Sequence, residues 1–430
     1  MRATRADTQS ERPPKAGTGD AAVGRWDSTL ARLRPHHRFA TVVLLVLVVA
    51  AQAFWIDHTM KKSYPMDFFA YYVAAEFFAE GRSPYDAWWT PEWKQASSEL
   101  DRRIDAPYLY PAQTAAIVNL LRPLGPQGAL LAWEIANSLA MVLGALVLGR
   151  ALGGRWMVPL SLAALLFWWP AFTTLTLGQV NGLVFLCLAS AIWGITHRND
   201  WALGLGLGAG VVLKMFPFAL VAYLVWRRRW RPTLIALGTI VATTLATMVV
   251  FDPATVADFF WDGLRLTQRG VPMRGPANHT IPAMVGYLPG IGTHTAAVTG
   301  YLLSLALIVA TAVLCWPRGD WRRWAPLEFS LVVCASLLAP SFSWYHLLVV
   351  SLVPALVVAQ TLWRQKCWTW LALGALLFAA TTVHGPVVYH YYTEVARLGV
   401  MNWLIAPFLF QMFLWCTAAW LLWRGKWAAE

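Results

Sequence analysis

A carboxylate, a lysine and a histidine lie at the ends or breaks of long apolar segments in this chain, and a second histidine, His279, lies in a long loop. Asp67 follows the first such segment, Lys214 interrupts a later one, and His346 begins another. A carboxylate in a partly apolar site can act as a general base, because desolvation raises its basicity. A lysine or arginine can stabilise charge that develops on a leaving phosphate. Such a set predicts transfer of a group from a phosphate donor to a hydroxyl.

Asp67 stands apart from the glutamates that follow it. On a helix through 67–80, Glu76 lies about 180° and Glu80 about 220° from Asp67, whereas Tyr71 lies within about 40° of it. Asp67 therefore faces the apolar side. It also follows a proline near the start of this helix, so capping of the helix is the alternative interpretation, and one position allows both roles.

The other candidates also have ordinary structural explanations. Gln179 and Asn181 could cap a helix, and Lys214 could extend its ammonium group to water. Arg82 could pair with Asp86 or contact a phosphate. We expect Asp67 and His346 to be catalytic, Lys214 and Arg82 to bind the donor phosphate, and the following residues to bind substrate: Tyr72, Tyr110, Gln179, Asn181, Asn278, His279 and Trp344.

Composition places these residues in a membrane protein. The chain is 58% hydrophobic and 13% charged and contains 26 tryptophans, which excludes an ordinary soluble protein. Its net charge of +12 is concentrated in short basic turns such as 227–231 and 318–324, which indicates cytoplasmic turns and not nucleic-acid binding. The five cysteines show no CxxC spacing and predict neither a disulfide nor a metal site.

The apolar segments predict an all-α integral membrane protein with about twelve transmembrane helices over 39–430. The segment 201–226 is broken at Lys214 and predicts a short re-entrant pair of helices. Residues 1–38 are expected to form a disordered basic cytoplasmic tail. Both termini are expected in the cytoplasm. The long segments 57–127 and 252–293 then form extracytoplasmic loops with their own helices and hold the active site.

Several motifs resemble one known family. They include "DFFAYYVAAEFFAEGRSPYD", "YLYPAQTAAIVNLLRPLG", "LGQVNGLVFL", "GVVLKMFPFALVAYLVWRRRWRP", "NHTIPAMV" and "SFSWYHLLVVSLVPAL". In this order they resemble the GT-C glycosyltransferases of family 87. The resemblance implies a GT-C fold with a catalytic aspartate at Asp67, a cavity histidine at His346, and Lys214 facing the donor phosphate. It also implies a polyprenyl-phosphate sugar donor and a glycolipid or glycan acceptor among membrane lipids.

The resulting hypothesis is inverting transfer of mannose in the cell membrane, with arabinofuranose as the alternative sugar. No cofactor is expected. A metal ion is not inferred, because Asp67 has no second acid at Asp-x-Asp spacing. A transporter or flippase of a lipid-linked sugar is a rival of another class, but it should show two similar halves, which the sequence lacks. A structural factor with an inactive site is the remaining rival.

Overall fold

The structure is a computed structural model that describes residues 36–62, 65–85, 87, 90–99, 108–263, 278–397 and 405–427. Most of the predicted tail 1–38, and also Asp86, lie outside the described residues. The described regular structure is helical apart from one isolated bridge. The helices are α2 His36–Lys62, α3 Met66–Ala79, α4 Pro91–Glu99, α5 Ala112–Leu121, η1 Arg122–Leu124, α6 Gly125–Leu152, α7 Met157–Phe167, α8 Trp169–Thr176, α9 Asn181–Thr196, α10 Asp200–Leu213, α11 Phe218–Trp226, α12 Trp230–Val250, α13 Pro253–Asp258, η2 Phe259–Gly263, α15 Ile281–Gly286, α16 Thr293–Leu314, α17 Trp321–Leu338, η3 Tyr345–Ser351, α18 Leu352–Arg364, α19 Trp368–Arg397, α21 Ala406–Leu422 and η4 Trp423–Trp427.

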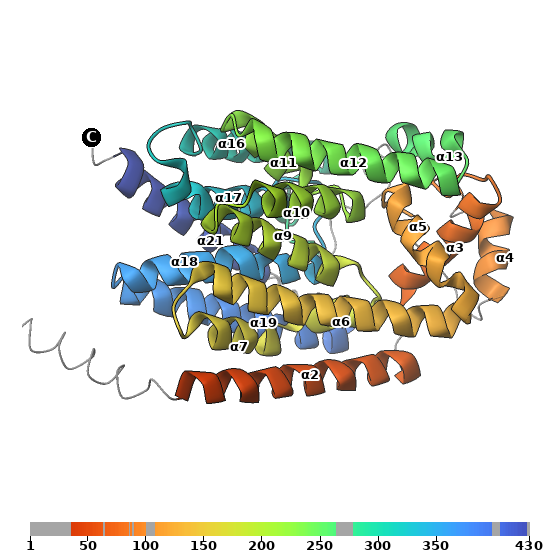
Figure 1. Ribbon diagram of the computed structural model, residues 1–430, viewed down its shortest axis with the longest axis horizontal. Helices are drawn as coiled ribbons and strands as arrows, with labels where there is room; N and C mark the ends of the chain where they lie inside the picture. Colours follow the sequence, from red (N-terminus) through yellow and green to blue (C-terminus); the bar gives the residue numbers. More distant parts are fainter. Residues whose placement is uncertain are drawn as a thin grey trace, which may run out of the picture.

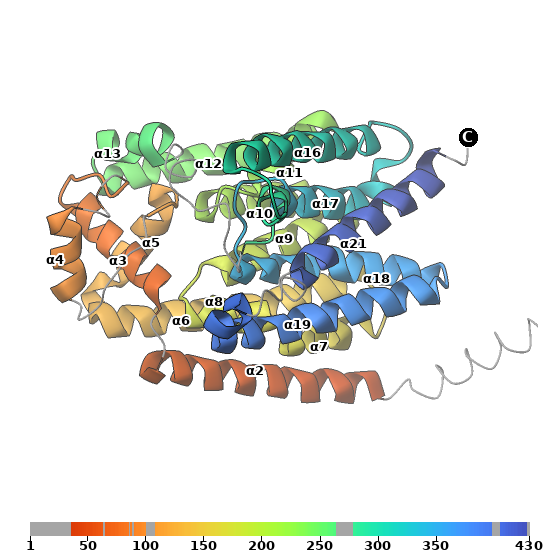
Figure 2. The same ribbon diagram turned by 180° about the vertical axis from the view of Figure 1, so that it is seen from behind.

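The long helices form a bundle with one specialised end. In Figure 1 they run roughly along the long axis of the molecule, and α3, α4, α5 and α13 gather at the end opposite the C-terminus. Figure 2 shows the same separation from behind. Large apolar side chains such as Phe39, Leu245 and Val249 are exposed on the outer helices, which is expected where lipid replaces water.

Six helical segments among the described residues are long and apolar enough to cross a membrane. A seventh is obtained when α7 and α8, which meet at a bend of 56°, are counted as one span. The expected count of about twelve is not confirmed. The apolar stretches at α9 and α10 form helices of only 16 and 14 residues, shorter than the roughly 20 residues that cross the hydrocarbon core.

The chain reverses direction between α10 and α11, at residues 214–217. Asp200 at the start of α10 lies 3.9 Å from Arg231 near the start of α12, which directly follows α11. The start of α10 and the end of α11 therefore lie on the same side of the bundle. This geometry is that of the predicted short pair, and it places Lys214 at the tip.

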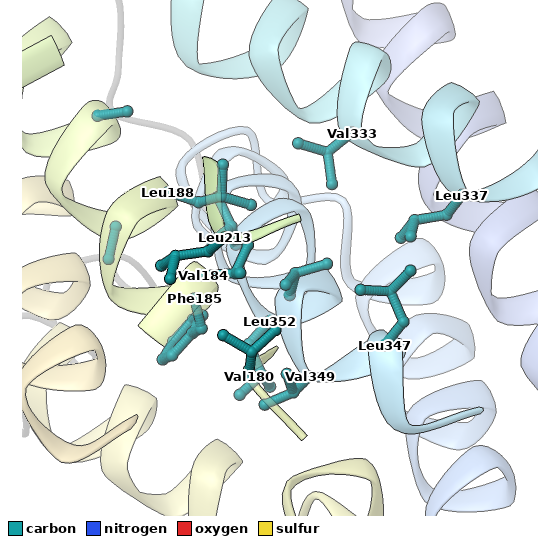
Figure 3. Close-up of a cluster of buried hydrophobic side chains, with 14 of the residues drawn as sticks. Val180, Val184, Phe185, Leu188, Leu213, Val333, Leu337, Leu347, Val349 and Leu352 are labelled. Atoms are coloured by element: carbon teal, nitrogen blue, oxygen red, sulfur yellow. The ribbon is translucent and has the colours of Figure 1, made fainter. Parts of the chain in front are cut away.

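An apolar core lies immediately behind the candidate site. Figure 3 shows side chains of α9, α17, α18 and η3 in one buried cluster with Leu213 at the end of α10. Val180, Leu213 and Leu347 in this core are the chain neighbours of Gln179, Lys214 and His346. Burial of these neighbours fixes the backbone at three polar positions that are far apart in the sequence.

Candidate active site

Helix α3 places Asp67 in its first turn. The N-cap is Pro65, which has no side chain able to cap, so Asp67 is not the capping residue. The amide N–H of Phe68 instead donates to the carbonyl of Leu177, at 3.3 Å. The start of α3 is therefore held against the turn between α8 and α9. A carboxylate in the first turn of a helix is also favoured by the helix dipole.

The turn after α8 depends on glycine. Gly178 adopts φ +68°, and a Cβ atom there would lie 2.4 Å from Cβ of Phe68. Its carbonyl accepts a hydrogen bond of 2.8 Å from the indole Nε1 of Trp133. The next amide, at Gln179, donates to the carbonyl of Thr174 at 2.8 Å, as in a Schellman-type helix end. These contacts aim Gln179 at the start of α3.

Small residues place Lys214. A Cβ atom at Gly206 would lie 2.7 Å from the carbonyl of Cys187 on α9, and one at Gly208 would lie 2.6 Å from Thr239 on α12. Helix α10 therefore packs in close contact with both neighbours. Thr114 on α5 donates to the carbonyl of Leu213 at 3.1 Å, so the end of α10 is fixed just before Lys214.

Side chains from three other segments converge on Gln179. Its Oε1 accepts hydrogen bonds from Tyr71 at 3.2 Å, from Tyr110 at 2.9 Å and from Nζ of Lys214 at 3.1 Å. Lys214 also donates to Oδ1 of Asn181 at 2.9 Å. Because three donors point at one end of the Gln179 amide, that end is the oxygen, and the NH₂ group is left to donate to Asp67.

Asp67 is half-buried beside this group. Burial raises the pKa of its carboxyl above the ordinary value, and this is opposed by the hydrogen bond from Gln179 and by the charge of Lys214. A raised pKa gives a stronger base. The opposing contacts favour the ionised form, in which the carboxylate can accept a proton.

Lys214 lies in the turn between two short helices, and its ammonium group faces inward. Burial lowers its pKa to about 7, while the charge of Asp67 acts in the opposite direction. Gln179, Asn181 and Tyr110 are its acceptors, and all three are uncharged. The ammonium is thus bound inside the protein and does not extend to water. The negative charge of Asp67, on the other side of Gln179, partly balances the positive charge of Lys214.

Tyrosines form the wall of this centre. Nζ of Lys214 lies 5.1 Å from the ring centroid of Tyr110, and the rings of Tyr71 and Tyr110 meet edge to face at 4.7 Å. Tyr110 was predicted as a substrate-binding residue. Tyr71 was not selected, although it bonds to Gln179, lies one helical turn after Asp67 and shares its face on the helical wheel.

Histidines extend the centre toward η3. Lys214 and His279 are the charged or ionisable groups that act on the ring of His346, which is buried. The backbone carbonyl of His346 accepts a hydrogen bond of 3.0 Å from Thr174 on α8. Burial and the nearby His384 lower the pKa of His279 well below its usual value, so His279 is neutral near pH 7. Neither ring nitrogen of His279 has a described hydrogen-bond partner.

Asn278 joins the segment before α15 to the segment before η3. Its side chain donates to the carbonyl of Ser341 and accepts from the amide of Ser343, both at 3.0 Å. Its backbone pairs with Trp344 in the isolated bridge. Asn278 thus has a structural role that supports His279 and His346. Trp344, on the other side of this bridge, is half-buried, and its ring centroid lies 6.3 Å from that of Phe342.

Two further predicted residues, Tyr72 and Arg82, also lie away from Lys214. Tyr72 faces another side of α3, where it accepts a hydrogen bond from Arg122 near Glu76. Arg82 follows the opposite end of α3, about 20 Å from Asp67 along the helix. It pairs with Glu80 and lies 3.9 Å from the ring centroid of Phe77.

The capping alternative for Gln179 and Asn181 is wrong. Helix α9 begins at Asn181, its N-cap is Val180, and no side chain caps it. Both amides instead bind Lys214. In the part of the chain that the structure describes, no group of three or more His, Cys, Asp or Glu side chains is arranged to hold a metal ion.

The fold and this centre define a multi-pass helical membrane protein with a polar site at one end. Residues 108–344, more than half of the chain, match the model of glycosyltransferase family 87. The chain therefore belongs to glycosyltransferase family 87 and is a membrane glycosyltransferase.

Two relatives illustrate the range of this family. One is the alpha-(1->3)-arabinofuranosyltransferase of Corynebacterium glutamicum, 26% identical over 381 residues, which are 82% of this chain and 79% of that protein. Another is the polyprenol-phosphate-mannose-dependent alpha-(1-2)-phosphatidylinositol mannoside mannosyltransferase of Mycobacterium tuberculosis. It is 25% identical over 262 residues, which are 58% of this chain and 60% of that protein.

Proposed function

We propose that this enzyme transfers a sugar from a polyprenyl-phosphate donor to a glycolipid or glycan acceptor at the extracytoplasmic face of the cell membrane. The observation that carries the proposal is the pairing of a half-buried carboxylate, Asp67, with an inward-facing lysine, Lys214, across Gln179. A base and a cation held this way suit attack by a hydroxyl and departure of a phosphate.

The proposed step balances with groups of this chain alone. The acceptor hydroxyl gives its proton to Asp67, and its oxygen bonds to the anomeric carbon of the donor. The bond from that carbon to the phosphate oxygen breaks, and its electron pair leaves with the phosphate, whose charge Lys214 stabilises. Attack opposite the leaving group inverts the anomeric carbon, so a β-linked donor gives an α-linked product.

The surrounding residues have supporting roles in this proposal. Tyr110, which is half-buried, packs against the sugar, the buried Tyr71 supports the ring of Tyr110, and Asn181 holds Lys214. His346 and His279 orient the donor phosphate or hold the acceptor. His346 approaches Lys214 from η3, whereas Gln179 lies in the turn between α8 and α9 and Asp67 lies on α3.

The orientation follows from charge. The basic turn at 227–231 contacts residue Trp316 through Arg227, so the turns that precede α12 and α17 lie together, at the end of the bundle away from α3. Basic turns favour the cytoplasm. We therefore place both termini in the cytoplasm and Asp67 outside.

Mannose and arabinofuranose are both candidate sugars. The donor named for the mycobacterial relative supports polyprenyl-phosphate mannose, which the motifs also favoured. The arabinofuranosyltransferase, however, aligns over about four fifths of both chains, against about three fifths for the mannosyltransferase. This longer match is the specific reason to keep arabinofuranose as the second candidate.

The test is transfer of radiolabelled sugar from each polyprenyl-phosphate donor, supplied separately, with wild type and Asp67→Asn. We expect one donor to be used and the variant to lose at least about 100-fold in rate. Glu80→Gln, which removes an exposed carboxylate just after the same helix, is the matched control and should behave as wild type. Full activity of Asp67→Asn would refute the mechanism, and use of neither donor by wild type would refute the proposed function.

A further inference from the structure

An apolar groove lies at the end of the bundle away from α3. It has a volume of about 950 Å³, which is large for a small-molecule pocket, and it is formed by parts of α2, α7, α18, α19 and α21. Of the described residues that line it, two are charged, and both are arginines: Arg155 and Arg364. Gln360 is the one lining residue with an uncharged amide side chain, and it is bonded to the carbonyl of Gly153 at 3.3 Å.

The two arginines mark one end of the groove. Arg364 donates to the carbonyl of Leu152 at 3.4 Å, and Arg155 follows Leu152 by three residues in the turn between α6 and α7. Arg155 and Arg364 are both exposed. Trp156 and Trp363 line the groove beside them, and tryptophan is typical of the membrane interface. The groove therefore has a basic mouth at interface level.

The other end of the groove is closed by aromatic rings. Trp168 stacks on Phe378 at 4.4 Å with an interplanar angle of 19°, and Phe378 and Phe410 line the groove. The indole of Trp168 donates to the carbonyl of Leu348 at 2.9 Å, which secures this floor to η3. The groove thus ends before it reaches the Lys214 centre.

The groove is about as long as one leaflet of the bilayer is thick. It follows α7 from Met157 to Phe167, about 15 Å along the helix, which is half of a hydrocarbon core of about 30 Å. Lys214 lies far from this mouth, because α6 runs for about 40 Å between α5, which contacts the end of α10, and the turn that carries Arg155. A chain that entered at the mouth would occupy a single leaflet.

We propose that this groove binds an anionic glycerophospholipid of the leaflet opposite the active site, with its phosphate at Arg155 and Arg364 and an acyl chain along α7. Basic pockets between transmembrane helices on the cytoplasmic side suit anionic headgroups, and arginine suits phosphate. The one-leaflet depth and the aromatic floor distinguish this occupant from the longer polyprenyl donor. The inference does not depend on the proposed reaction.

The test uses the full chain, freed of lipid in detergent and studied by native mass spectrometry with phosphatidylglycerol or with phosphatidylcholine of the same chains. We expect one phosphatidylglycerol per chain, bound in preference to phosphatidylcholine. Each arginine near an anionic headgroup contributes roughly fivefold, so Arg155→Gln/Arg364→Gln should bind about 30-fold more weakly. Arg322→Gln/Arg323→Gln removes two exposed arginines at the start of α17, outside the groove, and should bind as wild type does.

A second variant tests the acyl chain. Ala163→Phe adds a ring inside the groove and should weaken phosphatidylglycerol binding with both arginines intact. Its size-exclusion profile and sugar transfer serve as the checks of folding. Equal affinity for the two phospholipids, equal effects of the two arginine pairs, or no effect of Ala163→Phe in a folded protein would each overturn the proposal. Displacement of the phospholipid by polyprenyl phosphate at lower concentration would show that the occupant is wrong.

Discussion

Two polar clusters in this protein contain a buried or inward-facing lysine, and they differ in whether a carboxylate contacts the lysine directly. In the cluster around Glu328, Lys426 lies 2.7 Å from Oε1 and Arg227 lies 3.3 Å from Oε2, and Tyr223 donates to the same carboxylate at 2.8 Å. In the cluster around Lys214, the three hydrogen-bond acceptors are neutral, and the nearest carboxylate is reached through Gln179.

The difference separates a structural ion network from the proposed active site. Glu328, Arg227 and Lys426 are buried, and they join α11, α17 and the end of the chain. Carbonyls of Leu314 and Trp316 accept the remaining lysine hydrogens, so little capacity is left for a ligand. Lys214 and Asp67 are both half-buried. Gln179 lies between the two charges, which leaves both groups available to a substrate in the proposed reaction.

The largest effect on folding should come from Glu328→Gln. This change removes the carboxylate and leaves Arg227 and Lys426 buried without their counter-charge, which costs about 3–5 kcal/mol of stability. Thermal unfolding in detergent should show a strongly lowered midpoint. Glu76→Gln is the control, because its pair with Arg122 is partly exposed and should contribute under about 1 kcal/mol. An unchanged midpoint for Glu328→Gln would contradict the structural role of this cluster.

A pair of lysine variants compares the two clusters directly. Lys214→Met should lower sugar transfer about 100-fold, because it removes the cation that stabilises the leaving phosphate. Its unfolding midpoint should change little. Lys426→Met should do the reverse, with a lowered midpoint and nearly normal transfer per folded molecule. Rates normalised to folded protein, measured beside thermal unfolding, separate the two results. Equal loss of stability in both variants would remove the distinction between the clusters.

Several residues that the sequence singled out lie together in the structure, whereas the expected count of membrane spans is not confirmed. Asp67, Gln179, Lys214 and Tyr110 were all selected, because polar residues beside apolar segments are costly unless they have partners or functions. The count of about twelve spans is not confirmed, and apolar composition alone does not show where a segment bends or stops. The break at Trp168 divides one apolar stretch into α7 and α8 with a 56° bend.

Neighbouring residues explain the remaining differences. Tyr71 and Tyr72 are adjacent, but a helix turns by about 100° between them, so Tyr71 reaches Gln179 and Tyr72 reaches Arg122. Arg82 is close to Asp67 in sequence and distant along the helix. The roles of Asn278 and Gly178 depend on contacts with Ser341 and Phe68, which a single sequence does not pair.

The pH dependence of sugar transfer should also distinguish the Lys214 cluster from the Glu328 cluster. Asp67 must be ionised to accept a proton, so kcat/KM should fall as pH falls through its raised pKa. Lys214 must be protonated, and its pKa is about 7, so activity should fall as pH rises and should lie about tenfold below its maximum at pH 8. Lys214→Arg should lose this alkaline limb, because arginine stays charged.

The control for this profile is Lys426→Arg, which should keep the alkaline limb of wild type. The full pH profile of kcat/KM with the preferred donor makes the measurement. An alkaline limb that persists at the same pH in Lys214→Arg would assign it to another group and would contradict the role of Lys214.

The smallest effect should come from Arg82→Gln, which tests whether the polar residues at the far end of α3 belong to the site. The side chain of Arg82 is 41% exposed and already pairs with Glu80, so its removal should change sugar transfer by less than about twofold and stability by under about 1 kcal/mol. Initial rates at limiting donor concentration are the sensitive measurement, because a lost phosphate contact would first raise KM. A rise of tenfold or more in KM with unchanged kcat would return Arg82 to the donor site, and would mean that the donor extends along the whole of α3.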